Sequence, residues 1–220
     1  MERITLGRMQ NPIRGFLHGS AAIAASAGTI YLVSRTWGNL TALIGSLVFG
    51  LALIVMYTVS SLYHSIPWSE DWKKRLQRVD HSMIYLVVAG TFTPIAIAAL
   101  EGAARSWCLG LVWGIAVVGI VLKLVLPTVA TNLSVTLQLV MGWTVIFWLP
   151  QIWTSLGPGA IALITLGGVF YTVGVVFFVT ERPQLFPRAF SYHELFHVFV
   201  VLASVSHFLA IVTYAVPASV

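Results

Sequence analysis

The sequence predicts an all-α integral membrane protein in which seven transmembrane helices form one bundle. Of its 220 residues, 58% are hydrophobic and only 9% are charged, and the mean hydropathy is +0.91. A soluble domain usually has about a quarter of its residues charged, so lipid must replace water around most of this chain. The single cysteine, Cys108, excludes an internal disulfide and a thiolate metal cluster.

Uninterrupted apolar length places the seven helices, because a helix needs about 20 apolar residues to cross the hydrocarbon. We expect a short cytoplasmic segment at 1–15, a single membrane domain at 16–215 and a tail at 216–220. The helices are expected at 16–34, 40–63, 81–100, 106–126, 132–153, 158–180 and 192–215. The polar or helix-breaking residues that separate them lie, in order, at 35–39, 67–78, 101–105, 127–131, 157–158 and 181–188.

Basic residues are distributed unevenly between the two ends of such a bundle. Seven spans place Arg35 and Arg105 on one face of the membrane and the other ten Lys and Arg residues on the face that holds the N-terminus. Cytoplasmic loops carry the excess of positive charge, so we expect the N-terminus in the cytoplasm and the C-terminus outside. The basic residues lie in short loops rather than on one continuous patch, so no nucleic-acid partner is expected.

Ionisable residues of the predicted helices gather in the cytoplasmic leaflet. His64 lies at the inner end of its helix, Asp80 at the inner start of the next, and His193 and His197 in the first turns of the last. Ionisable groups at membrane depth are costly and indicate functional sites.

The histidine spacing indicates a metal site. His193 and His197 are four residues apart, so both imidazoles lie on one face of their helix. His64 would complete a three-histidine set with an open fourth position, which is typical of catalytic zinc. We therefore predict one Zn²⁺ per chain. The alternative is that these histidines are interfacial polar groups bonded to neighbouring carbonyls.

Glu194 also belongs to an HExxH pattern, in which the glutamate of a zinc protease is the general base. Ser191 stands three residues before it, and the pair forms a capping box at the start of the last helix. We favour the capping role over catalysis. On that interpretation a glutamine at position 194 would be tolerated.

Asp80 is the better candidate for the catalytic base, with capping of its own helix as the alternative. Ser60 lies one turn before His64, so its hydroxyl is predicted to reach the metal site or a ligand, or else to bond back to its own helix. His18 lies in the same leaflet, where a structural role is favoured over one beside the metal. His207 is too far along the last helix to share the metal.

The ordered set of Ser60, His64, Asp80, His193 and His197 in a seven-span chain resembles the hemolysin III family and the wider progestin and adipoQ receptor (PAQR) family. The resemblance covers nearly the whole chain. In that family the matching histidines bind zinc near the cytoplasmic face, and the matching Asp and Ser lie beside the metal's water.

The resemblance implies zinc-dependent hydrolysis of a membrane lipid, at the amide bond of a ceramide-like substrate from the inner leaflet or at an ester bond, in membrane lipid homeostasis. It also implies a multi-pass protein of the bacterial inner (plasma) membrane. The alternative is a non-enzymatic protein, a sensor or receptor, cytolysin or transporter, in which zinc joins the second and seventh helices. An open fourth coordination position favours the enzyme, and a fourth protein ligand favours the alternative.

Overall fold

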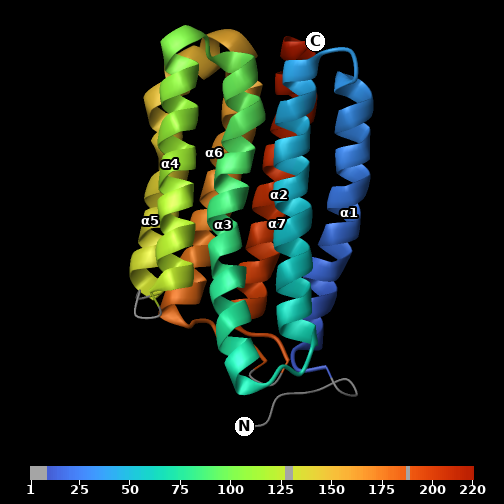
Figure 1. Cartoon of the computed structure of the whole chain (residues 1–220), viewed down its shortest axis with the longest axis vertical. Helices are drawn as coiled ribbons and strands as arrows, with labels where there is room; N and C mark the ends of the chain where they lie inside the picture. The colour runs from blue at the N-terminus through green and yellow to red at the C-terminus, as the bar shows by residue number, and fades with distance from the viewer. Residues whose placement is uncertain (1–8, 127–130, 187–188) are drawn as a thin grey trace.

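The computed structural model describes residues 9–126, 131–186 and 189–220, with the side chains of 131 and 132 excepted. Its regular elements are all helical, and the long helices lie side by side along one axis (Figure 1). In chain order they are α1 (Pro12–Thr36), α2 (Leu40–Ser65), α3 (Glu70–Ala99), α4 (Gly102–Val125), α5 (Thr131–Trp143), η1 (Thr144–Trp148), α6 (Leu149–Thr180), α7 (Tyr192–Ala210), η2 (Ile211–Ala215) and α8 (Val216–Ser219). Three of the basic residues counted above, Arg3, Arg8 and Arg188, lie outside the described residues, and so do residues 127–130 of the predicted break at 127–131.

Six helical segments of the described chain are long and apolar enough to cross a membrane. The prediction of an all-α, multi-pass membrane protein is therefore confirmed. The count differs from the predicted seven because Leu133–Thr180 forms one apolar helical run of 48 residues, where the sequence predicts separate helices at 132–153 and 158–180. The number of crossings and the orientation of the termini stay predictions.

That long run reverses direction at Gly157. Its backbone there is non-helical, with φ 80° and ψ 177°, in the region that favours glycine. After the reversal the Tyr171 hydroxyl donates to Gln138 Oε1 at 3.2 Å, and Trp143 Nε1 donates to Thr172 Oγ1 at 3.1 Å. A straight helix of this length would extend about 72 Å and keep these partners apart. The legs before and after Gly157 therefore lie beside each other (Figure 1).

Helix boundaries differ most from prediction at α3. It begins at Glu70 rather than at 81, so most of the predicted break at 67–78 is helical. Glu70 and Asp71 occupy its first turn, where negative charge interacts favourably with the helix dipole. Apolar length reports only the part of a helix in hydrocarbon, so it misses this polar extension.

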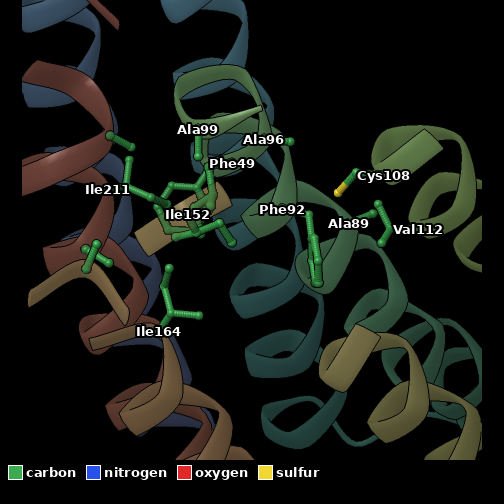
Figure 2. Close-up of a cluster of buried hydrophobic side chains, with 14 of the residues drawn as sticks. Phe49, Ala89, Phe92, Ala96, Ala99, Cys108, Val112, Ile152, Ile164 and Ile211 are labelled. Carbon is green, nitrogen blue, oxygen red and sulfur yellow. The ribbon is translucent and has the colours of Figure 1, made fainter. Parts of the chain in front are cut away.

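Apolar side chains fill the interior and also cover the outside of the bundle. Phe49 of α2, Phe92 of α3 and Val112 of α4 belong to one buried cluster (Figure 2). Large side chains such as Ile23 and Phe147 are exposed, at 75% and 71%. Exposed apolar surface of this kind suits contact with lipid.

Two glycines of α1 bring it close to α2. A Cβ atom at Gly15 would collide with the Ser65 hydroxyl, and one at Gly19 would press on Ser61. The Ser61 hydroxyl donates to the Gly15 carbonyl at 2.8 Å. This contact holds the first turns of α1 beside the last turns of α2, where His64 lies.

Candidate metal centre

Three histidines from two helices meet inside one end of the bundle. His64 comes from the last turn of α2, and His193 and His197 come from the first turns of α7. Each offers one ring nitrogen, and these nitrogens all lie within 4.8 Å of one another. The ring centroids are 4.9 to 5.3 Å apart. The set can therefore hold a metal ion between helices that are far apart in sequence.

The surroundings of His197 fit a metal ligand better than a structural histidine. Its side chain is buried, and its Nδ1 has no hydrogen-bond partner among the described residues. An unsatisfied buried polar atom is costly, and hydrogen bonds to nearby carbonyls would have relieved that cost. A set of three imidazole nitrogens is consistent with zinc.

Asp80 and Ser60 lie beside the histidines. Asp80 Oδ2 is 4.0 Å from His64 Nε2, which is too long for a direct hydrogen bond. The Ser60 hydroxyl is buried on α2 and interacts with the Asp80 carboxyl. Both side chains line one cavity with His193 and His197. The structure thus brings all five predicted site residues together, while their roles stay predictions.

Two cavities adjoin at this point. The first, beside the histidines, has an empty volume of about 600 Å³ including its open mouth. The second has an empty volume of about 1020 Å³, also including open space, and mainly apolar walls from α2, α3, α5, η1, α6 and α7. Met56, Ile84, Tyr171 and Val200 line both. A molecule with a polar group and a long apolar chain could therefore occupy both spaces.

Glu194 does not line the cavity beside the histidines and has two structural partners. The predicted capping box is present, with the Ser191 amide donating to Glu194 Oε2 at 2.8 Å and the Ser191 hydroxyl at 3.1 Å. The other carboxylate oxygen accepts a 2.6 Å hydrogen bond from Arg14 Nε. These two side chains are only 5% and 6% exposed. A buried ion pair thus joins the start of α1 to the start of α7.

Sequence reasoning missed Arg14 and undervalued His18. The His18 ring stacks on His197, with centroids 3.9 Å apart and planes 23° apart, and meets Tyr57 edge-on at 5.0 Å. The sequence alone presents Arg14 only as one of the cytoplasmic basic residues. The available signal was that Arg14 and His18 are four residues apart, on one face of the first helix.

His207 lies apart from the metal set, as expected. It lines the second cavity, and its Nε2 is 3.3 Å from the Ile164 carbonyl oxygen.

The fold and this site define a class: a multi-pass helical membrane protein with a candidate three-histidine metal centre inside one end of its bundle. Residues 7–208 match the family described as haemolysin-III related, and the chain belongs to that family. It is 30% identical to the hemolysin-3 homolog of Bacillus subtilis (strain 168) over 201 residues, which are 90% of this chain and 91% of the relative.

Other relatives extend the comparison. Hemolysin-3 of Bacillus cereus is 29% identical over 99% of this chain and 97% of its own length. The human monocyte to macrophage differentiation factor is 26% identical over 88% of this chain and 78% of its own length. The predicted resemblance to hemolysin III is confirmed, and the human relative supports the wider PAQR relationship.

Proposed function

We propose that the protein is a zinc-dependent hydrolase that cleaves the amide bond of a ceramide-like membrane lipid, or an ester bond of a related lipid. The observation that carries this proposal is the cluster of three imidazoles beside Asp80, in a cavity that adjoins an apolar one. His64, His193 and His197 would hold the ion. Zinc in a site of this kind polarises a carbonyl and makes a water molecule more nucleophilic.

Asp80 would move the proton. Its carboxylate accepts a proton from water as the water oxygen attacks the carbonyl carbon, and then gives it to the leaving amine as the carbon–nitrogen bond breaks. The Ser60 hydroxyl, which lines the same cavity, would help to orient that carboxyl. Glu194 cannot share this task while both its oxygens are engaged by Arg14 and Ser191.

The second cavity would receive an acyl chain. Its lining is mainly apolar, as the walls of small-molecule sites usually are. Its walls include Val87, Phe92, Ile146 and Leu149. Burial of an alkyl chain there stabilises the complex without hydrogen bonds.

We infer that the chain crosses the membrane seven times, with its N-terminus in the cytoplasm. The reversal at Gly157 supports two crossings within 133–180, and α1 begins at the end of the bundle opposite the C-terminus (Figure 1). Arg35 lies in the last turn of α1 and Arg105 in the first turn of α4, at the end away from the histidines. The positive-inside rule then places the histidines near the cytoplasmic face. The family's bacterial relatives favour the inner (plasma) membrane.

Fatty-acid release tests the proposed function. Purified, zinc-loaded protein in detergent is given a panel of lipid amides and esters, beside a variant in which His64, His193 and His197 are all alanine. We expect release by the unmodified protein only. Absence of release from every lipid on the panel would contradict the hydrolase.

The relative from Bacillus cereus is named Hemolysin-3, and this name favours membrane lysis as a second candidate. In that case zinc would have a structural role, joining α2 to α7, and would catalyse no reaction. Release of an encapsulated dye from liposomes measures lysis directly. Lysis without fatty-acid release would favour this candidate over the hydrolase.

A further inference from the structure

The cavity beside the histidines has a second polar wall, built from α3, α5 and α6. This wall consists of His81, Gln138 and Tyr171, which line the same cavity as His193 and His197. Gln138 Nε2 donates to the His81 carbonyl oxygen at 3.0 Å, and Gln138 Oε1 accepts from the Tyr171 hydroxyl at 3.2 Å. Polar side chains within transmembrane helices are costly and usually indicate a function.

The wall keeps unused hydrogen-bonding capacity. A glutamine amide has two N–H donors, and a tyrosine hydroxyl can accept as well as donate. One Gln138 N–H and the Tyr171 O–H are engaged in the contacts just given. The second N–H of Gln138 and the lone pairs of the Tyr171 oxygen remain, and the His81 ring makes no hydrogen bond within the described part of the chain. These groups can meet a ligand in the cavity.

One phenyl ring separates the wall from the candidate metal ligands. Phe178 meets His81 edge-on with ring centroids 6.2 Å apart, and meets His193 edge-on at 5.3 Å. A polar group attached next to a carbonyl held at the histidines would therefore lie close to the wall.

The charges lining the cavity favour an uncharged polar group. No Lys or Arg lines it within the described residues, and its one carboxylate is that of Asp80. An anionic headgroup would face Asp80, while Lys123 of α4, whose charge acts on the His81 imidazole, does not line the cavity. Hydroxyl groups suit the wall better because they both donate and accept hydrogen bonds, as its amide, phenol and imidazole do.

We propose that His81, Gln138 and Tyr171 form a headgroup subsite that binds the hydroxyl groups of an uncharged lipid headgroup. This proposal rests on the proposed function, in which the histidines hold the reacting carbonyl. It assigns the wall to substrate selection rather than to helix packing alone. The packing interpretation predicts instead that loss of the Tyr171 hydroxyl affects all lipids equally.

Two matched amides test the proposal. One is the oleoyl amide of 2-amino-1,3-propanediol, and the other is the oleoyl amide of isopropylamine, which has the same carbon skeleton without the hydroxyls. Equilibrium binding is measured with the full chain in nanodiscs, zinc-loaded and carrying Asp80→Asn so that neither amide is consumed. In this background the unmodified wall is compared with Tyr171→Phe and Gln138→Met.

The control is Tyr85→Phe. The Tyr85 hydroxyl also joins α3 to α5, by donating to the Ser134 carbonyl oxygen at 3.0 Å, but Tyr85 does not line the cavity. Ser134 lines the cavity but is not part of the wall. This variant therefore loses a buried helix-to-helix hydrogen bond and keeps all three side chains of the wall.

We expect the diol amide to bind about tenfold more tightly than the isopropyl amide, the effect of one or two hydrogen bonds. Tyr171→Phe and Gln138→Met should remove that preference and leave binding of the isopropyl amide unchanged, while Tyr85→Phe keeps it. Equal binding of the two amides to the unmodified wall would overturn the proposal, and so would equal losses for both amides in Tyr171→Phe. Because binding is measured without turnover, absence of hydrolysis would contradict only the proposed function.

Discussion

Replacement of Glu194 by glutamine separates its structural role from a catalytic one. The capping box alone predicts that the change is tolerated, because a glutamine oxygen can still accept from the Ser191 amide. The structure changes this expectation. Glutamine would turn a neutral amide toward the Arg14 guanidinium, whose Nε now lies 2.6 Å from a carboxylate oxygen.

The size of the effect follows from burial. Removal of one partner from a buried ion pair costs about 3–5 kcal/mol, because the other charge is left uncompensated. The capping hydrogen bond survives in Glu194→Gln, so we expect the lower end, about 3 kcal/mol of the free energy of unfolding. Ser191→Ala removes only the cap and should cost about 1 kcal/mol.

Unfolding of the zinc-loaded protein by SDS in mixed micelles measures both free energies. The matched control is Arg14→Met combined with Glu194→Gln, which removes both charges. We expect this double variant to be more stable than Glu194→Gln alone, since no buried guanidinium remains. A change below about 0.5 kcal/mol in Glu194→Gln, the size of an ordinary surface substitution, would refute the buried pair. Lost hydrolysis with unchanged stability would make Glu194 the base instead.

The remaining predictions concern metal, chemistry and topology. His193→Ala combined with His197→Ala should remove zinc while His207→Ala retains it, as measured by elemental analysis, and full zinc in the double variant would refute the site. Asp80→Asn should keep zinc but lower fatty-acid release about a hundredfold or more, and unimpaired release would show that Asp80 is not the base. Reporter fusions should place the N-terminus in the cytoplasm and the C-terminus outside, and a cytoplasmic C-terminus would contradict seven crossings.

Much of the fold could be predicted because apolar length and helix-breaking residues are local signals. The gathering of His64, Asp80, His193 and His197 at one end followed from counting spans, since each lies at a span end that faces the same side. The extension of α3 to Glu70 was not predictable in this way, because polar residues outside the hydrocarbon leave no gap in hydropathy.

Contacts between distant helices were harder to predict. The pairing of Arg14 with Glu194 and the stacking of His18 on His197 depend on how α1 rotates against α7, which span counting does not determine. Gln138 carries a signal of such a contact in the sequence itself. A lone amide side chain in an apolar helix needs a partner, and the structure supplies His81 and Tyr171.

Two contacts join the first helices to α7: the histidine set joins α2 to it, and the ion pair of Arg14 with Glu194 joins α1 to it. These contacts have a consequence for biosynthesis. The histidine set needs residue 197 of a 220-residue chain, and Arg14 meets its carboxylate only when α7 is in place. Until then His64 and Arg14 are inserted without these partners, in surroundings where polar groups are costly. Insertion of α7 therefore supplies partners for the polar side chains of α1 and α2. A chain truncated before α7 would keep these polar groups exposed, where membrane quality control can recognise them.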